Sequence, residues 1–234
     1  MAEDARAIAA EGRAIAIGSI CGGLTEGLFK MRGFEDGYMD LAADPDRARQ
    51  VMARILEIKL AYWDRILREL GGLVDIVGEA DDLGGQDRPL FSPAMYRALV
   101  KPLQRELFSF IRARTSARIF FHSCGAIREL IPDLIEIGVD ILNPVQVSAA
   151  GMDGADLKRE FGRDIVFWGG GVDTQRVLGG GTPDEVRADV RRRIADLRKG
   201  GGFVFAAVHN VQPNVPPENL VAMWETWREE AAYD

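Results

Sequence analysis

The stretch "ARIFFHSCGAIRELIPDLIEIGVDILNPV" (residues 117–145) points to the fold class. It begins with a short apolar run, continues with a segment of helical periodicity that Gly138 is placed to end, and closes with a second apolar run. The apolar residues that share one face of the helical segment are Ile127, Leu130, Ile131, Leu134 and Ile135. The order of strand, helix and strand is that of one β/α unit of a parallel sheet.

Apolar runs of the same kind recur along the whole chain. They are short, rich in Val, Ile and Phe, and mostly apolar on both faces, which is typical of buried parallel strands. The six runs span residues 14–20, 72–79, 117–122, 139–145, 164–170 and 202–209. Two arrangements of six such strands remain open at this point: an open doubly wound sheet and a (β/α) barrel.

The helices between these runs carry recognisable start signals. We predict starts at Asp44 followed by Pro45, at Ser92 followed by Pro93, and at Thr182 followed by Pro183 and Glu185. The second of these helices contains Pro102, which has no backbone N–H and therefore predicts a kink or a break.

The composition argues against several classes of protein. The chain of 234 residues has a net charge of −7 and no basic block, which argues against a nucleic-acid partner. Two cysteines cannot build a disulfide framework, so we expect a reducing, cytoplasmic setting. The first residues are acidic where a signal peptide would be basic, and no apolar run is long enough to cross a membrane.

Residues with polar or metal-binding side chains lie where the predicted strands end. Function in parallel α/β folds gathers at the carboxyl ends of the strands, because the loops meet there. In chain order these residues are Glu79, Asp81 and Asp82; His122 and Cys124; Asn143 and Gln146; Trp168 and Asp173; and His209, Asn210 and Gln212. Both histidines of the chain are therefore expected at strand ends.

His122 and Cys124 suggest the start of a metal site. Alternation along a strand turns both side chains to one face, and an imidazole beside a thiolate suits zinc. His209 is the natural third ligand, with Glu79 or Asp81 as an oxygen ligand or a supporting partner. The open alternatives are a cysteine that only packs and a histidine bonded to a backbone carbonyl. The glycines of "GGGVD" (169–173) offer amides for a phosphate or serve a tight turn.

Four segments together resemble the uroporphyrinogen decarboxylase superfamily. They are "FFHSCGAIRELIPDLIEIGVDILNPVQ" (120–146), "FWGGGVDTQRVL" (167–178), "GTPDEV" (181–186) and "HNVQPNVPPENL" (209–220). The resemblance runs from about residue 14 to the C-terminus. It implies an α/β fold of the (β/α)8 TIM-barrel type, as a single domain over residues 1–234 that lacks the first two β/α units. It also implies a homodimer.

The superfamily contains enzymes of two kinds, decarboxylases and methyltransferases. The "HSCG" segment resembles its zinc-dependent methyltransferase branch. In that branch an H-x-C pair binds zinc, and a later cysteine precedes a P-x-x-P-x-E-N pattern, where this chain has His209. The resemblance implies Zn²⁺ held by His122, Cys124 and His209, and methyl transfer to a thiol from a corrinoid carried by a partner protein. Glu79, Asp81 and Asp173 are the expected catalytic residues. The expected substrate-binding residues are Asn143, Gln146, Trp168, Asn210 and Gln212.

Two other functions stay open. The first is metal-free decarboxylation of uroporphyrinogen, in which Asp81 or Asp82 would hold the pyrrole N–H groups. The second is a truncated barrel that binds a ligand or partner without turnover, because missing strands leave sheet edges that invite pairing. Metal content separates the first hypothesis from both alternatives.

Overall fold

Strands and helices alternate along the chain in the structure, a computed structural model that describes residues 2–231. The strands are β1 (Ala16–Ile17), β2 (Ile76–Ala80), β3 (Arg118–His122), β4 (Ile141–Asn143), β5 (Val166–Trp168) and β6 (Phe203–Val204). The α-helices are α1 (Ala2–Ala10), α2 (Leu24–Arg32), α3 (Phe34–Ala43), α4 (Pro45–Leu70), α5 (Pro93–Met95), α6 (Lys101–Arg112), α7 (Ile131–Glu136), α8 (Gly154–Phe161), α9 (Pro183–Leu197) and α10 (Pro217–Glu230). A π-helical segment, η1 (Tyr96–Val100), and a 3₁₀ turn, η2 (Arg128–Leu130), complete them.

The six strands form one sheet in the order β1-β2-β3-β4-β5-β6. β1 pairs in parallel with β2 and β2 with β3, and likewise β4 with β5 and β5 with β6. In the β2–β3 ladder Ala80 lies opposite His122, so the two strands end level with each other. Strands in chain order with helices between them confirm the predicted α/β class and the six strands counted from the sequence.

The strands are shorter than the apolar runs that predict them. The clearest case is the run 202–209, of which only Phe203 and Val204 form β6. Beyond Val204 the chain runs against the glycine turn that follows β5, where the Gly171 N–H donates to the carbonyl of Ala206 at 2.8 Å. His209 therefore lies in a loop several residues after β6, and its expected place at a strand end was wrong.

The chain divides into two compact units. The first comprises Met1–Leu83, Leu90–His122 and Glu129–Asp140, and the second comprises Gly84–Pro89, Ser123–Arg128 and Ile141–Asp234. The single domain expected from the sequence stays a prediction, and each unit is described on its own.

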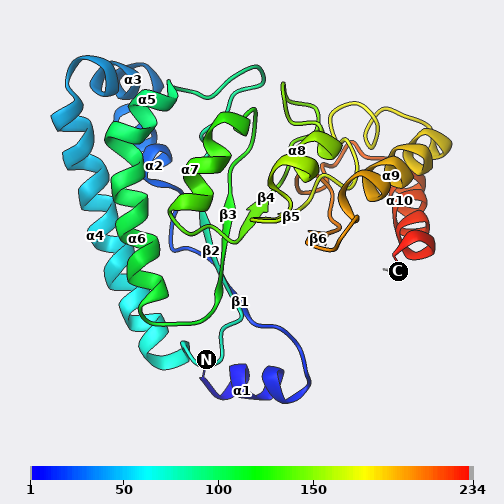
Figure 1. Ribbon diagram of the computed structural model, residues 1–234, viewed down its shortest axis with the longest axis horizontal. Coiled ribbons are helices and arrows are strands. Elements are labelled where there is room, and N and C mark those ends of the chain that lie inside the picture. Colours follow the sequence, from blue (N-terminus) through cyan, green and yellow to red (C-terminus); the bar gives the residue numbers. More distant parts are fainter. Residues whose placement is uncertain (1, 232–234) are drawn as a thin grey trace. The chain divides into compact units, whose positions relative to one another are not determined.

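The long helix α4 is the main support of the first unit. It starts as predicted, with the Asp44 side chain accepting from the Arg47 N–H and Pro45 at the first position. Its buried residues recur every three or four positions: Ala48, Met52, Ile55, Leu56, Lys59, Trp63, Leu67 and Leu70. With this face α4 contacts α2, α3 and α6, and it runs alongside α6 (Figure 1).

The predicted kink near Pro102 is present as a π-helical segment. Ser92 caps the start by accepting from the Met95 N–H. The helix then widens over η1, where the Lys101 N–H donates to the Tyr96 carbonyl, before α6 continues from Lys101. Pro102 has no N–H to complete the regular ladder, so the wider turn lies directly before it.

The second unit is built on α9 and α10, which pack together (Figure 1). α9 begins with the predicted capping box, in which the Thr182 and Glu185 side chains each bond the other's backbone N–H. Its buried face consists of Val186, Val190, Ile194 and Leu197, with Asp189 and Arg193 also buried. Asn219, at the start of α10, is buried and donates to the carbonyls of Leu178 and Gly181 at 2.9 and 2.8 Å.

No helix within residues 2–231 combines the length and the apolar character that crossing a membrane requires.

Candidate metal centre

His122, Cys124 and His209 form a cluster of potential metal ligands. One ligand atom of each, an imidazole nitrogen or the thiol sulfur, lies within 4.8 Å of the others. His122 ends β3 and Cys124 follows two residues later, whereas His209 comes from the loop after β6. The first two are half-buried and His209 is exposed. The three residues chosen from the sequence thus lie together, and metal binding by them stays a prediction.

The chemistry of this cluster fits zinc. Two imidazoles and one thiolate are nitrogen and sulfur donors of the kind that zinc prefers, at bond lengths of about 2.0–2.3 Å. Around a tetrahedral ion with such bonds the donor atoms lie about 3.4–3.8 Å apart. Atoms within 4.8 Å of one another therefore need side-chain movements on the order of an ångström to bind one ion. Three protein ligands leave one position of a tetrahedral site for a substrate, as in catalytic rather than structural zinc sites.

The turn that carries Cys124 is held by backbone hydrogen bonds. The Ser123 N–H donates to the Asn143 carbonyl at 2.8 Å, and the Ala126 N–H donates to the Gly85 carbonyl at 2.7 Å. Gly125 has a φ of +87°, and a Cβ there would lie 2.3 Å from the Gly84 carbonyl oxygen. Only glycine fits this position, so "SCG" presents the thiol on a defined turn.

Gln146 and Asn143, expected to bind substrate, are both bonded to the protein. The buried Gln146 side chain accepts from the Gly125 N–H at 2.9 Å and donates to the side chain of Gln86 at 2.9 Å. The Asn143 side chain donates to the carbonyl of Trp168 at 2.8 Å. These contacts stabilise the Cys124 turn and the ends of β4 and β5, while contact with a substrate stays a prediction.

Glu79 lies inside β2 in a buried polar network. It accepts from Lys59 Nζ at 2.7 Å and from the Trp63 indole N–H at 2.5 Å. Lys59 also donates to the Ser19 hydroxyl at 2.5 Å, and the side chains of Glu79 and Lys59 are at most 2% exposed. The carboxylate therefore fastens α4 to β2, and it does not belong to the His–Cys–His cluster.

Asp81 caps the start of α2. Its buried carboxylate accepts from the N–H groups of Thr25 and Glu26 at 3.1 Å, from the Thr25 hydroxyl at 2.5 Å and from Gln104 at 3.2 Å. Burial raises the pKa of Asp81 to about 6, although the hydrogen bonds from Thr25 and Glu26 act to lower it. The N-cap residue of α2, Gly23, has no side chain that could bind the N–H groups at the helix start. The Asp81 carboxylate takes this role instead.

Asp82 is the acidic residue that lies beside the cluster. Its Oδ1 is 3.8 Å from Nε2 of His122. Asp81 and Asp82 are adjacent in the sequence, and the prediction named Asp81, not Asp82, as a possible partner of the metal ligands. Strand alternation was the available signal, because consecutive residues point to opposite sides and only one of the two can face His122.

Asp173 closes the turn after β5. Its carboxylate accepts from the N–H groups of Gln175 and Arg176, and its own N–H donates to Asp189 at 2.8 Å. In the preceding glycines, the N–H groups of Gly169 and Gly171 donate to the carbonyls of Val204 and Ala206. These two amides are occupied, which favours the tight turn, one of the two roles left open for the "GGGVD" segment.

The remaining predicted substrate residues lie near the ends of β5 and β6. Trp168 ends β5 and is half-buried. Asn210 and Gln212 are exposed in the loop that carries His209, and the Gln212 side chain donates to the Asn210 carbonyl at 3.1 Å.

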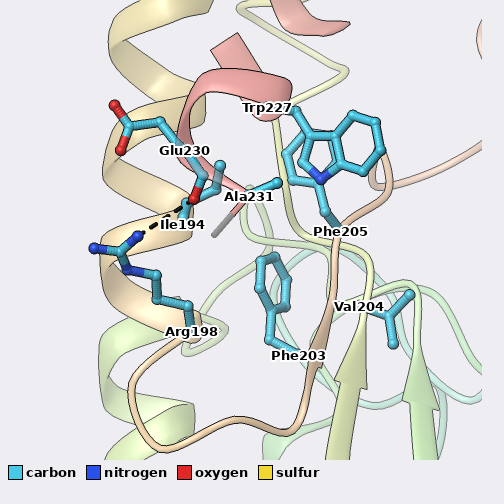
Figure 2. Close-up of a pocket in the computed structure, with 8 residues that line it drawn as sticks. All are labelled: Ile194, Arg198, Phe203, Val204, Phe205, Trp227, Glu230 and Ala231. Atoms are coloured by element: carbon cyan, nitrogen blue, oxygen red, sulfur yellow. Dashed lines mark hydrogen bonds between the residues drawn. The ribbon is translucent and has the colours of Figure 1, made fainter. Parts of the chain in front are cut away.

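An apolar pocket of about 250 Å³ lies elsewhere in the second unit (Figure 2). Its lining consists of Ile194, Arg198, Phe203, Val204, Phe205, Trp227, Glu230 and Ala231. The rings of Phe205 and Trp227 are stacked with centroids 5.8 Å apart, and Arg198 donates to the Glu230 carbonyl at 3.3 Å. None of the predicted site residues lines this pocket, so the candidate centre remains the His–Cys–His cluster.

The parallel six-stranded sheet with helices between its strands is that of an α/β protein of the TIM-barrel type. The family model for uroporphyrinogen decarboxylase matches residues 4–230, and the chain belongs to the uroporphyrinogen decarboxylase family. The resemblance to this family inferred from the sequence is thereby confirmed, whereas the methyltransferase branch that "HSCG" resembles stays a prediction.

One curated relative and two solved structures are similar to the chain to different extents. The uroporphyrinogen decarboxylase of Pelodictyon phaeoclathratiforme is 24% identical over 195 residues, which cover 81% of this chain and 51% of that protein. A methyltransferase from Methanosarcina mazei has a similar fold, with a TM-score of 0.72 at 18% identity over 99% of this chain and 64% of that one. A 3-keto-D-glucoside 4-epimerase from E. coli, in its apo form, has a TM-score of 0.56 at 14% identity over 98% and 83%. The chain spans about half the length of its curated relative.

Proposed function

We propose that this protein is a zinc-dependent methyltransferase that moves a methyl group from a methyl-corrinoid protein to a thiol. The observation that carries the proposal is the clustering of His122, Cys124 and His209, whose ligand atoms lie within 4.8 Å of one another. The fold shared with a methyltransferase from Methanosarcina mazei is compatible with it.

Different residues of the chain have different roles in the proposed reaction. His122, Cys124 and His209 would hold the metal, and the hydrogen bonds of Gln146 and Asn143 keep the Cys124 turn and the neighbouring strand ends in place. A bound Zn²⁺ would lower the pKa of an acceptor thiol at its open position, so that the thiol is a nucleophile at neutral pH. Trp168, Asp173, Asn210 and Gln212 would line the approach of the substrate.

The proposed reaction balances without a further reactant. The thiol gives its proton to solvent, and the sulfur electron pair forms the new bond to the methyl carbon. The carbon–cobalt bond breaks with its electron pair going to cobalt, which passes from Co(III) to Co(I). The products are a thioether and the reduced corrinoid.

Metal content is the first test of the proposal. We expect about one zinc per chain in protein purified anaerobically, and a loss of most of it in Cys124→Ser and His122→Ala. Cys21→Ser is the matched control, because Cys21 is the other cysteine, is exposed and lies outside the cluster. Stoichiometric zinc in the Cys124→Ser protein would show that the cluster is not the metal site.

Activity is the second test. We expect the wild-type protein to methylate coenzyme M with free methylcobalamin as donor, measured as loss of the cobalt–methyl absorption and as thioether formed. A chelator and Cys124→Ser should each remove at least nine tenths of the rate, whereas Cys21→Ser should keep it. Undiminished turnover after the metal is removed would disprove a metal-dependent transfer.

Decarboxylation of uroporphyrinogen is the second candidate, supported by the curated relative from Pelodictyon phaeoclathratiforme. Of the two aspartates proposed for this chemistry, Asp81 is buried at the start of α2, whereas the Asp82 side chain is 43% exposed. Asp82 is therefore the carboxylate that would meet the pyrrole N–H groups. Formation of coproporphyrinogen under anaerobic conditions, in the presence of a chelator, would favour this function, and no product would count against it.

A further inference from the structure

Asp82 and His122 face each other within the first unit. The distance between Asp82 Oδ1 and His122 Nε2 is 3.8 Å, and the two side chains are 43% and 28% exposed. This distance is longer than a direct hydrogen bond, so the carboxylate must approach by about 1 Å to accept a hydrogen bond from the ring.

Hydrogen bonds hold the residues next to this contact in position. Ala80 lies opposite His122 in the β2–β3 ladder, and the Asp81 N–H donates to the His122 carbonyl at 2.9 Å. The Asp81 side chain is in turn bound to Thr25 at the start of α2. Backbone and side-chain bonds of its neighbour thus set the position of Asp82 relative to His122.

We propose that Asp82 is a positioning residue for His122, which orients the imidazole ring and strengthens it as a metal ligand. The inference rests on the proposed function, since it assumes that His122 binds a metal. A ligating histidine has a second ring nitrogen whose N–H needs an acceptor, and a carboxylate there fixes the ring and raises its basicity. Glu79 and Asp81 are buried in other networks, so Asp82 is the carboxylate of this strand end that faces the ring.

Zinc affinity of the whole chain tests this role without any activity assay. Metal-free protein would compete with a chromophoric chelator for Zn²⁺, in wild type, Asp82→Ala and Asp82→Asn. We expect the dissociation constant of Asp82→Ala to rise about tenfold to a hundredfold. Asp82→Asn should lose less, because the amide oxygen still accepts a hydrogen bond. Asp87→Asn removes the same charge from an exposed residue nearby in the sequence and should change the affinity less than twofold.

A further readout separates positioning from folding. The metal-free variants should melt within a few degrees of wild type, and the absorption bands of the Co²⁺-loaded protein should shift in Asp82→Ala but not in Asp87→Asn. If Asp82→Ala lowers the melting temperature strongly, the comparison of Asp82→Asn with Asp87→Asn carries the test.

The two levels of inference can fail separately. Wild-type affinity in both Asp82 variants, with loss of binding in His122→Ala, would overturn the positioning role and leave the proposed function standing. Absence of zinc binding by the wild type, or unchanged binding in His122→Ala, would overturn both.

Discussion

At the scale of single residues, Gly23 has no room for a side chain beside Asp81. A Cβ at Gly23 would lie 2.0 Å from the Asp81 carboxylate, which binds the start of α2. We expect Gly23→Ala to lower the free energy of unfolding by about 1–3 kcal/mol, because the side chain must displace Asp81 or the helix end. Chemical denaturation measures the effect.

Gly72 provides the control for this substitution. A Cβ at Gly72 would meet nothing within 4 Å, and its φ is not in the left-handed region. Gly72→Ala should therefore leave the free energy of unfolding within about 1 kcal/mol of wild type, or raise it slightly. Equal effects of the two substitutions would show that contact with Asp81 does not limit position 23.

The residues of the candidate centre were predictable to different degrees. The rarity of histidine and cysteine, and the spacing of His122 and Cys124 after an apolar run, selected the three clustered residues. The acidic residues were harder, because Glu79, Asp81 and Asp82 look alike in the sequence. Their environments differ only once Lys59 and Thr25, from elements earlier in the chain, meet them.

At the scale of elements, Asp133 joins α7 to the segment around the π-helical turn. It accepts from Arg97 Nε at 2.9 Å and from Lys101 Nζ at 2.6 Å. Burial raises the pKa of Asp133, but the hydrogen bonds from Arg97 and Lys101 outweigh burial and leave the pKa below its ordinary value of 3.8. The ionised carboxylate is therefore the form that the folded state prefers.

This preference predicts a pH dependence of stability. A lowered pKa in the folded state contributes stability above the ordinary pKa, and this contribution is lost as the pH falls through the folded value. We expect Asp133→Asn to be less stable than wild type by about 1–3 kcal/mol at pH 7, and the difference to shrink below about pH 4. Denaturant unfolding between pH 3 and 7 measures it, and a difference that stays constant with pH would contradict the assignment.

Element starts were predicted well and element lengths less well. Asp44, Ser92 and Thr182 cap helices as expected, because a cap depends only on residues two or three positions away. The strands were overestimated, because an apolar run marks burial, whereas a strand also needs a neighbouring strand along its whole length. β6 shows this, since the chain after Val204 meets a glycine turn instead.

At the scale of the whole molecule, a bound metal should stabilise the fold. Zinc at a hundredfold excess over its dissociation constant would add about 2.7 kcal/mol to the free energy of unfolding, if the unfolded chain does not bind it. For a chain of this size that corresponds to a rise of about 5–11 °C in melting temperature. Thermal melts of the metal-free protein with and without Zn²⁺ measure the shift.

Substitution of each of the two cysteines provides the control for this stabilisation by zinc. Cys21→Ser should keep the zinc-induced rise in melting temperature, and Cys124→Ser should lose most of it, because only Cys124 belongs to the cluster. A rise of the same size in both variants would place the metal elsewhere in the chain.

The order of strands and helices, their caps and the adjacent pair of His122 and Cys124 could all be inferred from the amino-acid order. These features depend on neighbours within a few positions along the chain. Which distant groups meet depended on the folded structure: His209 reaches Cys124 through the loop after β6, and Asp82 rather than Asp81 faces His122. The physical reason is that the register of β2 on β3 and the packing of α2 against Asp81 set the direction of each carboxylate, and neither is written in local periodicity.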